Sequence, residues 1–199
     1  MELKVKEVFK EELLFIRKDR TREFVIRAFE LLVPDYFWSV PASSTGKYHP
    51  SFALGDGGVV RHTKSAIRIG VELLNNNTTC GDYSDDEKDI AVGALMMHDG
   101  RKSGFPKTEF TVFNHPAQMA KGILESEELK KEFVDIWDDI VIEIVRAIYT
   151  HMGEWCIDYK TNDRLPKPQS KVQKFVHMCD YLASRKCLEH NFEANVSRK

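Results

Sequence analysis

An adjacent His98-Asp99 pair is the part of this chain best suited to bind a metal ion. Imidazole nitrogens and carboxylate oxygens are common ligands of borderline and hard divalent metals. An aspartate beside a histidine can hold one ion together with that histidine and can also bridge to a second ion. The other candidate ligands, in chain order, are His62, His115, His151 and Asp180. We therefore predict a metal site built from residues far apart in the sequence.

Apolar residues recur at helical spacing along the chain, and little of it favours strands, which predicts an all-α fold. The N-terminal part should form one or two amphipathic helices over residues 2–32, and Pro34 stops this pattern. An irregular loop follows over residues 33–58. Further helices are expected over residues 59–74, over residues 133–149, and from Ser170 to about residue 188.

Two predicted helix ends coincide with candidate ligands. A buried helix capped by Asp85 or Asp86 should end at the His-Asp pair. Another helix should begin at His115, because Asn114 can cap it and proline is tolerated in a first turn. A buried carboxylate such as Asp99 is costly unless it has a partner. A metal ion would supply that partner.

The composition predicts one globular domain over residues 1–199. We place its core at about residues 57–188, with the N-terminal helices and loop of residues 1–56 packed on it. The chain is 42% hydrophobic, and its net charge of −2 gives no global field that attracts nucleic acid. The four scattered cysteines predict a reducing, cytoplasmic setting. No apolar run approaches the roughly 20 residues of a membrane span, so no membrane partner is expected.

The order His, His-Asp, His, His, Asp resembles the HD-domain superfamily of metal-dependent phosphohydrolases. Those proteins are helical bundles in which each ligand comes from a different helix or helix end. The resemblance is carried by GGVVRHTK at residues 57–64, LMMHDGRKSG at 95–104, NHPAQMAKGIL at 114–124, THMGEW at 150–155 and VHMCDYLASR at 176–185.

The resemblance implies a ligand set and leaves the number of ions open. A single-metal site would use His62, His98, Asp99 and Asp180. His115 and His151 favour the two-metal branch of the superfamily, in which Asp99 bridges two ions. In a one-metal nucleotide hydrolase, the two added histidines would instead act as a general acid or a phosphate contact. The cofactor is then one or two divalent ions among Mn²⁺, Fe²⁺, Co²⁺, Ni²⁺, Zn²⁺ and Mg²⁺.

Basic residues near these motifs are candidates for substrate binding. Arg61, Arg101 and Lys102 lie beside motif residues, and both side-chain types bind phosphate oxygens. Lys47 belongs to the segment PASSTGKYHP, whose hydroxyls and N–H groups suit a phosphate or a ribose as well as an ordinary turn. The segment is not a P-loop, because proline stands where that motif needs glycine and Tyr48 follows the lysine.

The resemblance implies hydrolysis of a phosphoester or phosphoanhydride by metal-activated water, with Asp99, His115 and His151 as the catalytic residues. The favoured substrate is a small nucleotide such as a dNTP or dNMP, because no added nucleic-acid-binding domain is apparent. The alternative is a phosphodiesterase or 3′–5′ exonuclease acting on short single-stranded nucleic acid. A non-catalytic nucleotide-binding module is a third reading, which the complete ligand set disfavours.

Three further features have open interpretations. His177 shares a helix face with Asp180, so it is either a partner that orients this aspartate or a half-buried structural histidine. His49 lies in the loop without a signal that places it at the site, and His190 is expected on the surface. An apolar stripe suits either the core or an interface between copies of the chain, and it comprises residues 133, 136, 137, 140 and 141.

Overall fold

The computed structural model describes residues 2–189, and His190 lies outside them. The predicted all-α class is confirmed there, because the only extended pairing among these residues is one isolated bridge between Ile157 and Arg164. The α-helices are α1 Glu2–Val8, α2 Lys10–Leu13, α3 Asp19–Leu32, α4 Gly58–Leu74, α5 Asn77–Cys80, α6 Asp85–Met97, α7 His115–Leu124, α8 Glu127–Glu132, α9 Ile142–Thr150 and α10 Lys171–Ala183.

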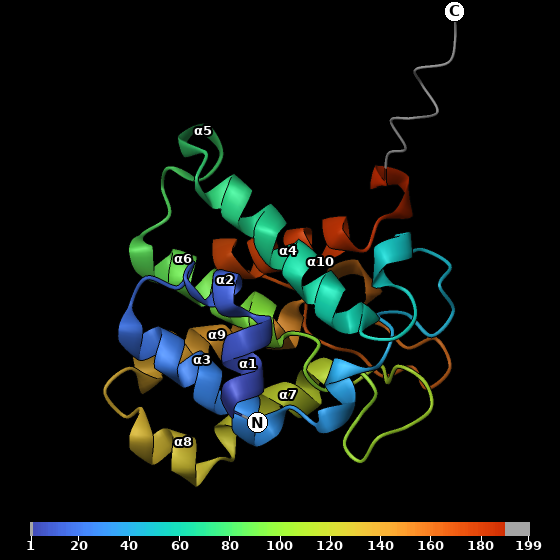
Figure 1. Cartoon of the computed structure of the whole chain (residues 1–199), viewed down its shortest axis with the longest axis horizontal. Coiled ribbons are helices and arrows are strands. Elements are labelled where there is room, and N and C mark those ends of the chain that lie inside the picture. The colour runs from blue at the N-terminus through green and yellow to red at the C-terminus, as the bar shows by residue number, and fades with distance from the viewer. Residues whose placement is uncertain (1, 190–199) are drawn as a thin grey trace, which may run out of the picture.

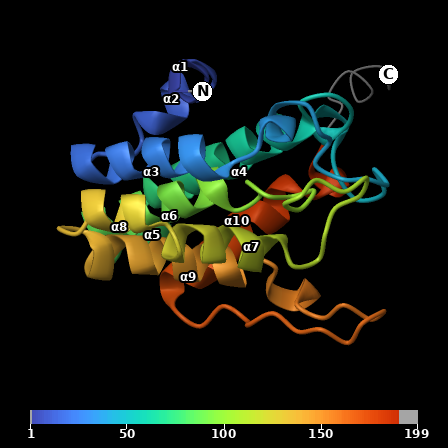
Figure 2. The same ribbon diagram turned by 90° about the horizontal axis from the view of Figure 1, so that it is seen from below.

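Helix α6 lies at the centre of the bundle. Every residue from Asp89 to Met97 is buried, and α3, α4, α9 and α10 all pack against this helix. Figure 2 shows α3 on one side of α6 and α9 on the other. A helix that is covered on all sides belongs inside a core. The His-Asp pair, which follows the last residue of α6, is thereby delivered to the interior of the protein.

Local sequence signals set the starts of two ligand-carrying helices. Helix α4 begins after Gly57, whose φ of +66° favours glycine. Helix α6 is capped by Ser84, and not by Asp85 or Asp86 as predicted. The Ser84 hydroxyl accepts the N–H of Glu87 at 3.2 Å, and the Glu87 carboxylate accepts the N–H of Ser84 at 2.9 Å. This reciprocal pair satisfies two N–H groups that a helix start leaves without partners.

Helix α10 begins as predicted and ends early. Ser170 caps it, but the helix stops at Ala183 instead of continuing to about residue 188. The Ser184 hydroxyl donates to the carbonyl of Tyr181 at 2.7 Å. A side chain that bonds to its own backbone in this way competes with the next helical hydrogen bond. A short 3₁₀ turn, Lys186–Leu188, follows.

The N-terminal segment forms three helices where one or two were predicted. Between α2 and α3, the N–H groups of Arg17 and Lys18 donate to the carboxylate of Asp89 at 2.9 and 2.8 Å. Asp89 is fully buried in α6, and burial raises its pKa. Its carboxylate accepts N–H groups at the start of α3, as a capping side chain from the adjacent sequence would otherwise do. A partner about 70 residues away along the chain is invisible to local sequence patterns.

A second break falls within the helix predicted over residues 133–149. Residues 133–136 form a turn, and a π-helical turn over Trp137–Val141 precedes α9. The Phe133 ring packs edge-on against Phe24 of α3, with centroids 5.4 Å apart, and Arg20 lies over the same ring. These contacts tie the segment to α3 before α9 begins. The predicted apolar stripe packs into the core.

The long connections gather at one end of the bundle, as the cyan, yellow-green and orange segments show on the right of Figure 1. The predicted loop over residues 33–58 is irregular apart from two 3₁₀ turns, Asp35–Trp38 and Ser51–Ala53. At this end α4 and α7 begin, and α6, α9 and α10 end. Five helix termini therefore face a common space.

Candidate metal centre

All six predicted ligands converge at the end of the bundle where these connections gather. The four histidines and Asp99 are buried, and the Asp180 side chain is 19% exposed. Two groups of ligand atoms can each hold a metal ion, and Asp99 belongs to both. The ligands lie in the second turn of α4, after α6, at the start of α7, after α9 and in the last turn of α10, and they are His62, His98-Asp99, His115, His151 and Asp180.

The first group comprises His62, His98 and Asp99. Nε2 of His62 lies 3.3 Å from Nε2 of His98 and 3.7 Å from Oδ2 of Asp99. Asp180 completes this group, because its Oδ1 lies 2.9 Å from Nε2 of His62 and 3.5 Å from Nε2 of His98. The structure thus brings together the four residues expected of a single-metal site.

The second group comprises Asp99, His115 and His151. Oδ1 of Asp99 lies 3.0 Å from Nε2 of His115 and 3.7 Å from Nε2 of His151. The two Nε2 atoms are 3.3 Å apart. Since Oδ2 of the same carboxylate faces the first group, Asp99 reaches both groups at once.

Three of the four histidines are held in the same way. The Nδ1–H of His98, His115 and His151 donates to the carbonyl three residues earlier in the chain, at 2.7, 2.7 and 2.8 Å. A carbonyl oxygen only accepts, so the proton sits on Nδ1 and the Nε2 lone pair faces the centre. Two of these carbonyls, those of Leu95 and Ile148, belong to the last turns of α6 and α9. The helix ends therefore fix the tautomer that a metal ligand needs.

The second group places three acceptors face to face. Because the protons are on Nδ1, the Nε2 atoms of His115 and His151 each carry an unprotonated lone pair. Oδ1 of Asp99 is buried without a hydrogen-bond partner. Burial lowers the pKa of both histidines, to about 3 for His151, which keeps a second proton off these rings. Two nitrogens bound to one ion at about 2.1 Å stand roughly 3.0–3.4 Å apart. The 3.3 Å spacing fits a divalent cation.

Both carboxylates carry charge. Burial opposes the ionisation of Asp99, yet Lys102 and His98 hold the pKa of Asp99 well below its usual range. Burial likewise opposes ionisation of Asp180, and contacts with His62 and His98 hold its pKa well below the usual range. Although burial works against it, Asp99 raises the pKa of His98, so a proton and a metal ion compete for this group. The C-terminal ends of α6, α9 and α10 add partial negative charge that favours a cation.

Lys102 is the predicted phosphate contact that the structure brings to the centre. Its Nζ donates to Oδ2 of Asp99 at 2.7 Å, and its side chain is 12% exposed. An ammonium group in this position is close enough to exchange a carboxylate oxygen for a phosphate oxygen.

The other predicted substrate contacts form hydrogen bonds elsewhere or lie in the loop. Arg61 donates to two carbonyls of the loop before α4. Arg101 is half-buried and donates to carbonyls at the end of α3 and in α7, at 3.1 and 3.0 Å. Lys47 is exposed, and its Nζ lies 5.0 Å from the centroid of the neighbouring tyrosine ring. The role of these three residues in substrate binding stays a prediction.

His177 has a different partner from the one that its spacing predicts. Its Nδ1–H donates to the backbone carbonyl of His151 at 2.8 Å, and the side chain is half-buried. The ring lies directly on Gly153, where an added Cβ would meet it at 2.1 Å, and this glycine has a φ of +54°. His177 therefore positions the turn that carries His151, and the interpretation as a half-buried structural histidine is the better one.

His49 is a site residue that the sequence did not place. The loop brings its ring to a centroid distance of 5.4 Å from the ring of His62. Its Nδ1 is buried without a hydrogen-bond partner. Burial, followed by the neighbouring His62, lowers the pKa of His49 to about 4. The only sequence signal was a histidine in a loop that leads into the first ligand-carrying helix.

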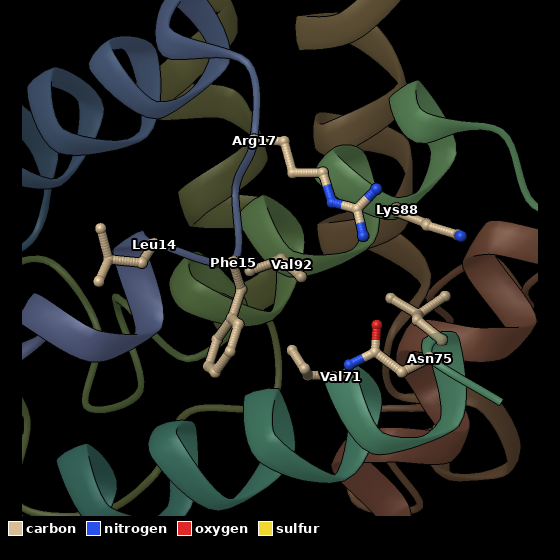
Figure 3. A pocket seen from close by; sticks show the side chains of 8 residues that line it. Leu14, Phe15, Arg17, Val71, Asn75, Lys88 and Val92 are labelled. Atoms are coloured by element: carbon tan, nitrogen blue, oxygen red, sulfur yellow. The ribbon is translucent and has the colours of Figure 1, made fainter.

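A separate cavity of about 170 Å³ lies between the α2–α3 connection, α4 and α6. Figure 3 shows Arg17, Val71, Asn75 and Lys88 around it. Its nearest lining residues on α4 and α6 are Val71 and Val92, which stand roughly 14 Å and 9 Å along their helices from His62 and His98. The cavity is not part of the metal centre.

Comparisons with protein-family models, with curated proteins and with solved structures give no match to this chain. The resemblance to the HD superfamily therefore rests on the sequence motifs alone. Among residues 2–189, none of the helices has the length and apolar character needed to span a bilayer.

Proposed function

We propose that the chain is a metal-dependent phosphohydrolase of the HD type, which cleaves a phosphoester or phosphoanhydride bond of a nucleotide. The observation that carries this proposal is the carboxylate of Asp99, shared between two buried groups that can each hold an ion. Two ions close together are a recurring arrangement in enzymes that displace groups at phosphorus. A binding module would not require two complete sets of buried ligands around one carboxylate.

The donor set suits divalent ions of the first transition row. Imidazole with carboxylate is compatible with Mn²⁺, Fe²⁺, Co²⁺, Ni²⁺ and Zn²⁺, whereas Mg²⁺ prefers oxygen ligands. Bound ions would supply an activated water and would neutralise charge on the phosphoryl oxygens. Asp99 would bridge the ions, with His62, His98 and Asp180 on one and His115 and His151 on the other.

Other polar groups of the site would act on the substrate. Lys102 offers its ammonium group beside Asp99, where it can bind a phosphate oxygen. His49 lies on the loop side of the site, next to His62, where an imidazole can position the leaving oxygen. The burial of five of the six ligands excludes bulk water, which strengthens each electrostatic contact with the substrate.

Product analysis tests this function. The purified protein is incubated with Mn²⁺, the four deoxynucleoside triphosphates and a short single-stranded oligonucleotide, and the products are separated by chromatography. Loss of a triphosphate beside an intact oligonucleotide supports the proposal, and the product identifies the bond that breaks. Shortening of the oligonucleotide alone supports an exonuclease instead. Asp99→Asn is the matched control, because it keeps the size of the side chain and removes its charge, and full activity in this variant refutes the proposed site.

A further inference from the structure

Exposed aromatic rings, an exposed lysine and a half-buried arginine lie beside the candidate metal centre. We call this group the aromatic–cation cluster, and it consists of Lys47, Tyr48, Trp155, Tyr181 and Arg185. The rings of Trp155 and Tyr181 are stacked, with centroids 5.3 Å apart and planes 16° from parallel. The Arg185 guanidinium lies 4.4 Å from the centroid of Tyr181 and 5.3 Å from that of Trp155. The cluster therefore offers flat surfaces next to a positive charge.

The rings of this cluster are open to solvent, unlike the large aromatic residues of the core. Tyr48 is 56% exposed, Trp155 is 48% exposed and Tyr181 is 37% exposed, whereas Trp137 is 7% exposed. Apolar surface gathered in one exposed place is a mark of binding sites. The three rings come from three separate parts of the chain, so their meeting at one place is a product of the fold.

Charge in the cluster has one sign. The centroid of the Tyr48 ring lies 5.0 Å from Nζ of Lys47 and 5.9 Å from the Arg185 guanidinium. The guanidinium donates to the hydroxyl of Ser184, and no carboxylate in residues 2–189 forms an ion pair with either cation. A surface that combines stacking faces with uncompensated positive charge fits a ligand that is both flat and anionic. A nucleobase joined to a phosphate is such a ligand.

Chain connectivity places the cluster at the edge of the metal centre. Tyr181 directly follows the ligand Asp180. Tyr48 directly precedes His49, whose ring lies 5.4 Å from that of His62. Because consecutive Cα atoms are only about 3.8 Å apart, the Tyr181 ring is anchored beside the predicted ligand Asp180 and the Tyr48 ring beside His49. A small ligand can therefore contact the cluster and the metal centre together.

We infer that the aromatic–cation cluster binds the nucleobase of the substrate while the phosphate lies at the metal centre. This inference rests on the proposed function, because it assigns a base-binding role beside a centre whose phosphate chemistry is itself proposed. The rings of Trp155, Tyr181 and Tyr48 hold the base by stacking, and the Arg185 guanidinium adds a cation–π contact with the base. Arg185 and Lys47 also offset the negative charge of the phosphate. The cluster then selects nucleotides over phosphoesters that lack a base.

Nuclear magnetic resonance tests the inference without any need for turnover. The ¹⁵N-labelled full chain is titrated with adenosine and, separately, with ribose, neither of which has a phosphoester bond to lose. The chain has 3 tryptophans, so its indole N–H groups give as many signals, and Trp155→Phe identifies the one of interest. We expect adenosine to shift the Trp155 signal and leave the other two in place. Ribose should move none of them.

Variants then measure the contribution of each group. Tyr181→Ala should weaken adenosine binding about 10-fold, and Arg185→Gln about 5-fold. Trp155→Phe keeps a stacking ring and should retain most of the affinity. Tyr159→Ala is the matched control, because it removes a ring that is 91% exposed from the same connection. Its affinity for adenosine should equal that of the unchanged chain.

The outcomes separate this inference from the proposed function. The inference is overturned if adenosine does not shift the Trp155 signal, or if ribose shifts it equally. Unchanged affinity in Tyr181→Ala and Arg185→Gln overturns it as well. Nucleotide hydrolysis without an adenosine shift refutes the base-binding cluster alone. An adenosine shift without hydrolysis of any phosphoester supports the cluster as a base-binding surface and refutes the proposed activity alone.

Discussion

Nε2 of His115 and Nε2 of His151 lie 3.3 Å apart, with their lone pairs facing each other. The Nδ1–H of each ring donates a hydrogen bond to a backbone carbonyl three residues earlier. Two unprotonated nitrogens at this distance repel, and Oδ1 of Asp99 adds a third acceptor 3.0 Å from the first. A shared cation would turn this repulsion into coordination, so the pair could hold a metal ion together with Asp99.

Metal content gives a direct test of this relationship. After reconstitution with Mn²⁺, we expect elemental analysis to find two ions per chain in the unchanged protein and one ion in His115→Gln. Asp99→Asn should lose both ions, because its carboxylate faces both groups. His177→Gln should keep two, since that ring bonds to a backbone carbonyl. Two ions retained in His115→Gln would contradict the second site.

Chelation should lower the thermal stability of the protein. An ion that binds only the folded state at a concentration 100 times its Kd adds about 2.7 kcal/mol, and 1 kcal/mol moves Tm by roughly 2–4 °C in a chain of this size. We therefore expect EDTA to lower Tm by roughly 5–10 °C, as measured by circular dichroism. Asp99→Asn should show no response to EDTA. If EDTA leaves the Tm of the unchanged protein the same, the protein holds no resident ion.

The candidate ligands were predictable from the sequence because their motifs, in this order, resemble those of the HD superfamily. The His-Asp pair follows a run of apolar residues, and His115 follows an asparagine and precedes a proline. Such signals involve neighbouring residues, so they can be recognised in a single sequence. The bridging position of Asp99 between two groups is not local. It depends on five helix termini meeting, which only the packed bundle supplies.

Several features that sequence analysis missed depend on long-range contacts. His49 reaches the centre because the loop folds over the start of α4. The break between α2 and α3 depends on Asp89, and the turn at residues 133–136 depends on a ring of α3. The spacing of His177 and Asp180 correctly put them on one helix face. It could not show that the nearest acceptor would be a carbonyl of His151.

Replacing Gly153 tests whether His177 positions the turn that carries His151. Gly153→Ala adds a methyl group 2.1 Å from the His177 ring at a φ of +54°, so the ring must move and its hydrogen bond must break. We expect a loss of about 1–3 kcal/mol in the free energy of unfolding, measured with urea. In Gly153→Ala/His177→Ala the clash is gone, so the two effects should be less than additive by about 1 kcal/mol. Strict additivity would show that the ring and the turn are independent.

Removing Asp89 should destabilise the fold without touching the metal centre. Asp89→Ala leaves the N–H groups of Arg17 and Lys18 without their acceptor, at a cost of about 2–4 kcal/mol. Asp85→Ala is the matched control, since Asp85 forms an exposed ion pair with Arg17 and should change stability by less than about 1 kcal/mol. Equal losses in the two variants, measured by urea unfolding, would contradict the capping role of Asp89.

The same comparison has a predictable pH dependence. Burial raises the pKa of Asp89 although the Lys18 and Arg17 N–H groups oppose the shift, so the folded state holds this proton more tightly than the unfolded state. The stabilisation linked to that proton is fully present below the pKa that Asp89 has in the unfolded state. It is lost as the pH rises through the pKa that Asp89 has in the folded state. The unchanged chain should therefore gain stability relative to Asp89→Ala as the pH falls through this window. Urea unfolding of both chains across the acid range measures the difference, and a gap that widens with rising pH would reverse the sign and refute the raised pKa.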